Sequence, residues 1–487
     1  MRSRVLSTCL AISGLLVGCG GDDSGGDEQG PPDAFVGGGA GGGEGGAGGG
    51  GEGGMAGGGG GEERVRMSFV RRIEPRDGGS LTNDLVVFDI QDGVEHNLTA
   101  GLDGEVDCGA RLCALNASMT TLGWLQRGDS GRFSLFVAPV EVTSNVEDMR
   151  VLIDQKREVD TDVISFAFTG DDVVGDLVVY SRGTAAGAQD LLDVIAVPVT
   201  GEDEAACPSI EEPYKCKQIV GSVNVNGGFK VGSRGRVVIR ATTDLSSMTI
   251  GFTNLVTGAQ QDLYIFGEMG GTGSMFSGTL PIGLSPDGSY LAVFTDSNFM
   301  WRMNILQVVP NPPPPEVIDL FESPTNPDGT CARQAPFNFN QVRFDPRFTA
   351  NGEQMFFLAT GDCSIRNTAG ASRDDFDILS VDPSTPSTDA IANITNNPRA
   401  NHWSNHSIQY YDLSPDGSQV AFIAPREFDI QSHSIWVMDV ESGEFDCTQG
   451  TSSPGIDGRD RCEFVSGEVQ NASVKHRNLQ YHTVTAR

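Results

Sequence analysis

The sequence has few basic residues for its length. Its 487 residues include 33 lysines and arginines against 65 aspartates and glutamates, so the formal net charge is −32. Nucleic acids bind proteins largely by exchanging counterions for basic side chains, and the sequence contains no basic patch that would do this. The composition therefore argues against nucleic acid as a partner, and it disfavours adsorption to anionic lipid surfaces.

Several catalytic and cofactor motifs are missing as well. The chain has no G-x-S-x-G nucleophile elbow, no phosphate-binding P-loop and no EF-hand calcium loop. The glycine-rich stretch near its N-terminus has no strand or helix signal on either side, so it is not a dinucleotide-binding fingerprint. The sequence therefore predicts no catalytic residue and no cofactor, and it favours a binding protein over an enzyme.

The N-terminus has the layout of an export signal. Arg2 and Arg4 precede an apolar run from Val5 to Val17, which is too short to span a bilayer. The run ends in Leu16-Val-Gly-Cys19, which resembles the bacterial lipobox. That resemblance implies a signal peptide over residues 1–18 and a lipid chain on Cys19. The alternative is a plain signal peptide with a cysteine at this position.

Glycine dominates the segment that follows. Gly20 and Gly21 come directly after Cys19 without an acidic residue, which in lipoproteins of this kind implies the outer membrane rather than retention in the inner one. Residues 19–62 are mostly glycine with some Asp, Glu and Ala, a composition that cannot bury apolar surface. We predict a disordered tether with a root-mean-square span of about 35 Å.

The cysteines fit an oxidising compartment. Of ten cysteines, Cys9 leaves with the signal peptide and Cys19 carries the lipid, so eight remain. An even number in an exported protein favours disulfides, and the absence of C-x-x-C spacing argues against a zinc site. Sequence alone leaves the connectivity open. Pairing of neighbours is the simplest arrangement: Cys108 with Cys113, Cys207 with Cys216, Cys331 with Cys363, and Cys447 with Cys462.

A repeated β-unit organises the C-terminal half. Ser285-Pro-Asp-Gly288 and Ser414-Pro-Asp-Gly417 have proline where a turn fixes φ and glycine where it needs a positive φ. Each turn precedes an apolar strand, Tyr290–Phe294 in the first copy and Gln419–Ile423 in the second. A further strand, Ser434–Val440, follows in the second copy. Two copies of one β-unit predict a repeat protein.

This unit resembles the repeat of TolB-type β-propellers. Asp84–Thr99 and Phe376–Thr395 are weaker copies of the end of such a repeat, and Phe344–Gly352 stands at the position of the turn with an insertion. TolB-type propellers engage envelope lipoproteins, so the resemblance implies a binding role in the envelope. TolB carries a separate N-terminal α/β domain where this chain has a tether, so the resemblance does not extend to a place in the Tol–Pal system.

Strand-like segments recur from residue 63 to residue 487 with no amphipathic helix between them. We therefore predict an all-β fold, a single β-propeller domain of about seven blades, with six or eight as alternatives. The first blade lacks an opening strand before Arg64. We predict that Leu479–Thr485 supplies it and closes the ring, which removes an open sheet edge.

The most enzyme-like cluster is His402-Trp403-Ser-Asn-His406, just before the last repeat. Some TolB-like lyases hold a metal with channel-facing histidines, so the resemblance makes a metal or sugar site at His402 and His406 an alternative. Two histidines four apart share a metal readily on a helix, whereas this segment reads as a loop. We favour loop packing under Trp403 and predict no metal site.

These observations lead to two hypotheses. The first is a monomeric, lipid-anchored propeller of the bacterial cell envelope, in the outer membrane and facing the periplasm or the cell surface. It would act as a non-enzymatic scaffold for an envelope protein or a cell-wall polymer. The alternative is a carbohydrate- or metal-binding propeller enzyme, a lyase or hydrolase, that uses the region of His402 and His406.

Overall fold

The computed structural model describes most of the chain between residues 63 and 485. The described residues are 63–109, 112–128, 131–169, 177–183, 191–199, 217–224, 229–231, 236–242, 248–254, 260–266, 282–286, 288–297, 300–308, 316–319, 346–349, 351–359, 377–387, 390–395, 408, 410–425, 432–442, 451–454, 460–464 and 472–485. The helical elements with described bounds are two 3-10 turns, η1 (Val146–Asp148) and η2 (Ile153–Gln155), and Ala390 is also in 3-10 conformation. Neither has the length or apolar character to cross a membrane.

The described strands form seven antiparallel sheets, which we number as blades 1 to 7. Blade 1 has the strand order β3-β2-β1-β30, and blades 2 to 7 are built from successive groups of the remaining strands. Neighbouring strands follow the sequence except that β8 pairs with β6 in blade 2, and that blade 7 has the order β25-β26-β27-β29-β28. The strands are β1 (Glu63–Pro75), β2 (Thr82–Asp89), β3 (Val94–Asn97) and β30 (Ala472–Thr485) in blade 1; β4 (Cys113–Leu115), β5 (Thr121–Arg127), β6 (Phe133–Glu141), β7 (Arg150–Val151) and β8 (Arg157–Asp160) in blade 2; β9 (Val163–Phe168), β10 (Leu177–Gly183), β11 (Leu191–Pro198) and β12 (Lys217–Asn224) in blade 3; β13 (Phe229–Val231), β14 (Arg236–Thr242), β15 (Met248–Asn254) and β16 (Gln260–Phe266) in blade 4; β17 (Ile282–Leu284), β18 (Tyr290–Ser297), β19 (Met300–Gln307) and β20 (Glu316–Asp319) in blade 5; β21 (Arg347–Phe348), β22 (Met355–Ala359), β23 (Asp377–Val381) and β24 (Ala392–Asn393) in blade 6; β25 (Tyr410–Leu413), β26 (Gln419–Pro425), β27 (His433–Asp439), β28 (Thr451–Pro454) and β29 (Asp460–Phe464) in blade 7.

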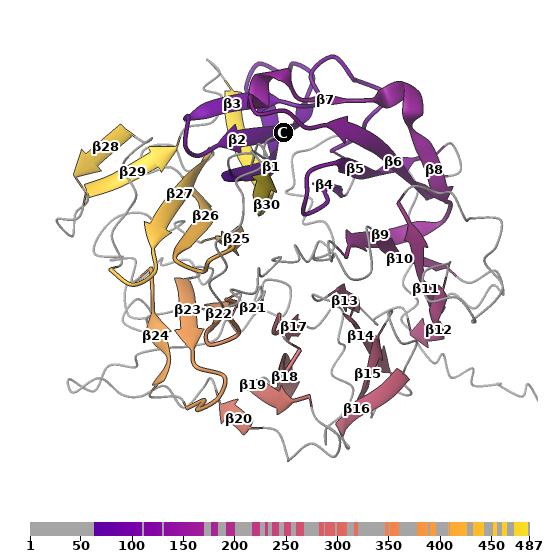
Figure 1. Cartoon of the computed structure of the whole chain (residues 1–487), viewed down its shortest axis with the longest axis vertical. Helices are drawn as coiled ribbons and strands as arrows, with labels where there is room; N and C mark the ends of the chain where they lie inside the picture. The colour runs from indigo at the N-terminus through magenta and orange to yellow at the C-terminus, as the bar shows by residue number, and fades with distance from the viewer. Residues whose placement is uncertain are drawn as a thin grey trace, which may run out of the picture.

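The blades follow one another around a ring in chain order, which makes the fold a β-propeller (Figure 1). The yellow strand β30 lies beside the indigo strand β1, where the two ends of the ring meet. β30 pairs antiparallel with β1 from Glu63↔Thr485 to Pro75↔Ala472. The predicted closure by the C-terminal segment is therefore confirmed. The number of blades stays a prediction, because segments between the sheets lie outside the described residues.

The same hydrogen bond fixes the turn between the first two strands of several blades. Ser285 Oγ accepts from Tyr290 N at 2.9 Å, and Ser414 Oγ accepts from Gln419 N at 2.9 Å. Thr349 Oγ1 plays this part in blade 6, where it accepts from Gln354 N at 3.1 Å. The glycines three residues after these hydroxyl residues have positive φ, at 71°, 74° and 73°. The blade 6 turn has the common spacing, so the predicted insertion within Phe344–Gly352 is wrong.

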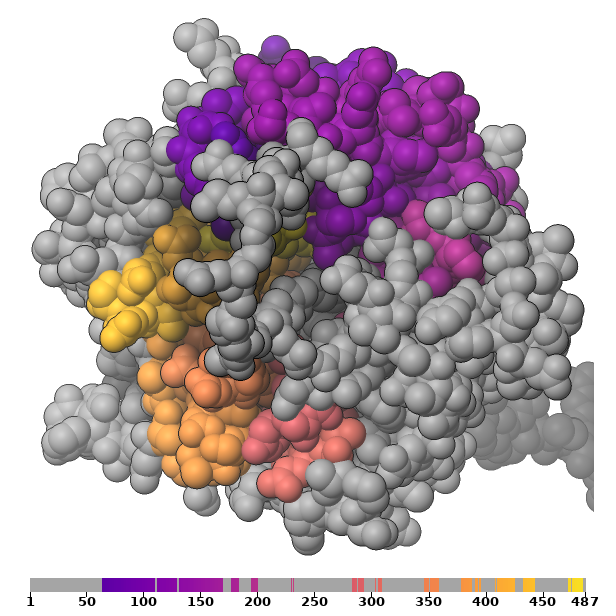
Figure 2. All heavy atoms as spheres, viewed as in Figure 1, coloured from indigo at the N-terminus to yellow at the C-terminus, as the bar shows by residue number. Residues whose placement is uncertain are grey.

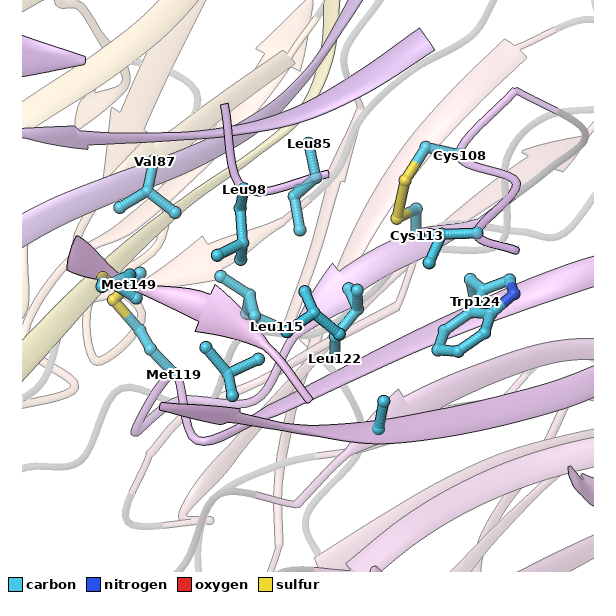
Figure 3. Packing of buried hydrophobic residues seen from close by; sticks show 14 of the residues in the cluster. Leu85, Val87, Leu98, Cys108, Cys113, Leu115, Met119, Leu122, Trp124 and Met149 are labelled. Carbon is cyan, nitrogen blue, oxygen red and sulfur yellow. A yellow bond between two sulfur atoms is a disulfide. The ribbon is translucent and has the colours of Figure 1, made fainter. Parts of the chain in front are cut away.

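Apolar side chains hold neighbouring blades together face to face. Figure 3 shows the cluster between blades 1 and 2, where Leu85 and Leu98 point toward Leu115, Leu122 and the residues around them. Further clusters join blade 2 to 3, blade 6 to 7 and blade 7 to 1. In the space-filling view the described residues of the first blades form one continuous body, from indigo to magenta (Figure 2). Strands buried on both faces agree with the near-continuous apolar runs in the sequence.

A glycine allows blades 2 and 3 to approach closely. A Cβ built on Gly123 of β5 would lie 2.8 Å from Phe166 Cε2 and 2.9 Å from Phe168 Cζ, both on β9. The two rings stand edge to face, with centroids 5.7 Å apart. Real Cβ atoms do not come this close to their neighbours, so an added methyl group forces the rings or the strands apart.

We therefore expect Gly123→Ala to lower the free energy of unfolding by about 1–3 kcal/mol. The measurement is equilibrium urea unfolding followed by tryptophan fluorescence. Gly183→Ala is the matched control, because a Cβ at Gly183 meets no atom within 4 Å and its φ is not positive. Equal urea midpoints for the two variants would contradict this prediction, because the interface between blades 2 and 3 would then accommodate the added methyl group without loss of stability.

Candidate functional site

The polar residues that the structure brings together lie mainly where the ring closes. We call this region the closing seam: β1 and β30, with the residues of blades 7 and 2 that they contact. Met67 and Phe69 of β1 belong to the apolar cluster shared with blade 7. Arg66 and Ser68 are on the opposite face of the strand, toward blade 2, because side chains alternate along a strand.

A bulge in β30 sets which of its residues face each neighbour. Ser68 pairs with Gln480, whereas Val70 pairs with Arg477, so β30 has one extra residue opposite Phe69. Asn478, at this point, has a φ of 56°. A bulge shifts the alternation of a strand by one residue. His476 before the bulge and Leu479 after it therefore both face blade 7.

Two arginines of blade 1 donate hydrogen bonds to backbone carbonyl oxygens of blade 2. We call this arrangement, in which one guanidinium nitrogen bonds two successive carbonyl oxygens, a clasp. Arg66, which is fully buried, forms an ion pair with Asp89 (Nε to Oδ2, 3.1 Å). Its Nη2 donates to Thr143 O at 2.9 Å and to Ser144 O at 2.8 Å. Arg477 repeats this arrangement, because its Nη2 donates to Cys108 O at 3.4 Å and Gly109 O at 3.1 Å.

The same clasp joins blades 2 and 3. Arg157 Nη2 donates to Pro198 O at 3.3 Å and to Val199 O at 2.9 Å. In each of these three clasps one guanidinium nitrogen bonds two successive carbonyl oxygens of another blade. A charged donor gives each of these bonds more strength than a neutral one would. The arginines therefore fix the positions of blades rather than present charge to a ligand.

A carboxylate links strands of three blades. Asp412 of β25 accepts from the backbone N of Tyr481 in β30 at 2.7 Å. Its other oxygen, Oδ1, accepts from Arg347 of β21, which forms an ion pair with it. The Arg347 guanidinium also lies over the ring of Tyr411, 5.6 Å from the centroid. Asp412 thus ties blade 6 and blade 1 to blade 7.

A serine and a histidine meet inside the seam. Ser68 Oγ lies 2.8 Å from His482 Nε2, and Nδ1 of the same ring lies 3.4 Å from Ala117 O. This is the hydroxyl–imidazole arrangement that many hydrolases use, with a carbonyl in place of the third residue. Ser68 is only 1% exposed and His482 only 3%, so a substrate has no route to the hydroxyl. Burial lowers the pKa of His482 to about 4, which keeps the ring neutral.

All four histidines within the described residues lie at the interfaces of blade 1. Besides His482, His96 Nε2 lies 2.9 Å from Met149 O in blade 2. On the other side, His433 Nδ1 accepts from the backbone N of His476 at 3.3 Å. The ring of His476 packs edge-on against Phe69, 5.2 Å away. The rings of His482, His96 and His433 thus bond groups of another blade, and the ring of His476 packs against β1 of its own blade.

Most of the site residues predicted from sequence lie outside the described part of the chain. Cys19, His402 and His406 are among them, as are the side chains of six of the eight paired-cysteine candidates: Cys207, Cys216, Cys331, Cys363, Cys447 and Cys462. Cys108 and Cys113 form a disulfide, as predicted for this pair of neighbours. It closes the loop that Arg477 clasps, at the edge of the cluster in Figure 3. Within the described ranges, no three potential metal ligands come together.

Sequence analysis missed the polar residues of the seam. Arg66 and Asp89 are 23 residues apart, and Arg66 reaches Ser144 over 78 residues. Nothing in the local sequence indicates such pairs. One signal was available: Arg66 and Ser68 stand in the predicted strand at 64–70, and His482 stands in the one at 479–485, where apolar residues are the rule. Polar residues in a strand buried on both faces indicate specific partners.

The comparisons with known proteins found similar structures only. No family model and no curated protein matches the chain. TolB from Acinetobacter baumannii is 11% identical, with 81% of this chain and 79% of that chain covered, at a TM-score of 0.35. The β-propeller domain of the Trilobed protease from Pyrococcus furiosus is 9% identical, with 76% and 89% covered, at a TM-score of 0.42.

An acylaminoacyl peptidase from Pyrococcus horikoshii is 9% identical, with 78% of this chain and 51% of that chain covered, at a TM-score of 0.43. The chain thus spans about half the length of that peptidase. All three TM-scores are below 0.5, so these superpositions add no weight to the fold, which rests on the sheets themselves.

Proposed function

We propose that this protein is a lipid-anchored propeller of the bacterial cell envelope that acts as a non-enzymatic scaffold. In this proposal Cys19 holds the chain on the outer membrane, the glycine-rich tether gives it reach, and the propeller binds an envelope protein or a cell-wall polymer. The protein works as a monomer, with its rim and loops available for contact.

The observation that carries the proposal is that polar side chains of the closing seam bond groups of neighbouring blades. Arg66, Arg477 and His482 bond carbonyl oxygens of blade 2, and Asp412 bonds groups of blades 6 and 1. The hydroxyl–imidazole pair of Ser68 and His482 is buried away from solvent. These are the contacts of a rigid frame, and a rigid frame with variable loops is how propellers and similar folds present binding surfaces.

The anchor can be tested by acylation. Cells that express the full chain are fed a labelled fatty acid, and the protein is isolated and scored for label. We expect the wild type to incorporate label and Cys19→Ser to lose it, because the thiol of Cys19 takes the lipid. Cys9→Ser is the matched control, since that cysteine lies in the predicted signal peptide and should leave labelling unchanged. Label that persists in Cys19→Ser would refute the anchor.

The scaffold can be tested by capture. The full-length protein, purified in detergent with its disulfides intact, is incubated with solubilised envelope or isolated cell wall. We expect one saturable protein or polymer that survives moderate salt. A variant lacking Asn478 is the control, because it keeps the anchor and tether but should lose the closed ring. Stoichiometric bound metal, or capture of nothing by folded protein, would contradict the scaffold and favour the enzyme alternative.

A further inference from the structure

The tether enters the propeller through a strand that has neighbours on both sides. β1 pairs with β30 from Glu63 to Pro75, and with β2 from Arg66 to Ile73. β30 is the last described strand and stands at the edge of blade 1, where β1 is its one partner in the described sheet. Two ladders therefore hold the strand that follows the tether, and one ladder holds the strand at the other end of the chain.

Side chains of β1 strengthen this hold on both faces. Met67 and Phe69, each 1% exposed, pack into the cluster shared with blade 7. Arg66 clasps blade 2 through Thr143 and Ser144 and pairs with Asp89, which is also buried. Pulling β1 out would break the clasp and leave the Asp89 carboxylate buried without Arg66, which is a costly state.

We propose that β1 is a load-bearing strand through which the propeller passes force from the tether into the ring. The inference rests on the proposed anchor at Cys19. A protein attached to a membrane at one end and to a partner through its propeller is pulled between the two, and β1 is the described strand nearest to the proposed anchor. The rate of forced unfolding governs how long such an attachment lasts, so a strand held by two ladders prolongs it.

The register provides a matched comparison of the two chain ends. Glu63 and Thr485 are paired with each other, so a pull on either end acts at the same point of the fold. A pull on Glu63 has to free β1 from β2 and β30 together. A pull on Thr485 has to free β30 from one ladder, with β1, and from its side-chain and backbone contacts with blades 7 and 2. The side chains of both strands contact the neighbouring blades, so the number of ladders is the difference that the comparison tests.

The test is force spectroscopy on the full chain. One handle is attached at Gln354, an exposed residue of blade 6, and the other at Glu62 or at Ala486, just outside the two paired residues. At equal loading rate we expect the pull from Glu62 to need about twofold more force, because both ladders have to fail together. Equal forces, or a weaker N-terminal pull, would overturn the proposal.

A variant sharpens the result. Arg66→Met should lower the force of the Glu62 pull and leave the Ala486 pull unchanged, since β30 can detach without breaking the clasp. A fall in both pulls would count against a specific role of β1. If Arg66→Met does not fold, Arg64→Gln removes the weaker pair with Asp89 and Asp92 in the same strand. The force asymmetry is measured whether or not Cys19 is acylated, so failure of the anchor and failure of the load-bearing strand are distinguishable.

Discussion

Deleting the single residue Asn478 is expected to destabilise the propeller almost as much as deleting Asn478–Arg487, the last ten residues. Without the bulge, one half of β30 has to turn its side chains to the opposite faces. Either Leu479 and Tyr481 turn out of the apolar cluster with blade 7, or Arg477 turns toward blade 7 while His476 turns toward blade 2. Burying polar groups in an apolar cluster and exposing apolar ones should cost about 4 kcal/mol or more.

Asn478→Gly is the control for this deletion. Glycine accepts the positive φ at this position without strain, so the bulge and the register remain. In the described part of the chain, the Asn478 Nδ2 is buried without a hydrogen-bond partner, so its loss should change stability by less than about 1 kcal/mol. Urea unfolding of disulfide-intact protein measures all three variants. If the single deletion unfolds at the wild-type midpoint, the bulge does not set the faces of β30.

Mild acid is expected to destabilise the protein through His482. Burial lowers its folded-state pKa to about 4, against an ordinary value near 6.5. The unfolded chain therefore binds a proton in this range that the folded protein does not. The stabilisation is complete above about pH 6.5 and is lost as the pH falls toward 4, by about 3 kcal/mol in total.

The measurement is the free energy of unfolding by urea at several pH values between 7.5 and 4.5. His482→Gln should reduce stability at pH 7.5 and flatten the pH dependence, because an amide does not titrate. His96→Gln, which removes another histidine bonded to a blade 2 carbonyl, should keep the slope because His482 is still present.

Carboxylates whose pKa the fold lowers contribute mainly at the acidic end of this range and below it. The Ser384 hydroxyl, for example, holds the pKa of Asp382 below its ordinary value, so that contribution is lost only at more acidic pH. An unchanged slope in His482→Gln would mean that another group carries the acid sensitivity.

The turns could be predicted from the sequence, because they depend on residues that are close together in the chain. The serines of the two Ser-Pro-Asp-Gly turns fix the strands that follow them, as residues of those types do in turns. Asn116 makes the same bond to Thr121 N at 2.9 Å in blade 2, but its turn has Met119 at a φ of 60° where the others have glycine. Sequence analysis missed this copy because the residue types changed while the geometry stayed the same.

Closure was predictable for a related reason. An unpaired first strand and a leftover strand-like C-terminus leave one simple arrangement, and β1 and β30 adopt it. The polar partners within that pairing were not predictable. His402 and His406 drew attention because they are close in sequence, whereas Ser68 and His482 meet across 414 residues. Such pairs are set by which strands become neighbours, which short-range pattern does not encode.

The pairing of β1 with β30 also dictates the order of assembly. Blade 1 stays incomplete until β30 has been synthesised, because β30 is the partner of β1. A long-range pairing of this kind forms slowly, because the intervening chain has to be arranged first. If the chain is exported as proposed, a ring that is not yet closed would be easier to thread across a membrane. The fourteen-residue strand β30 would then pair with β1 and close the ring after export.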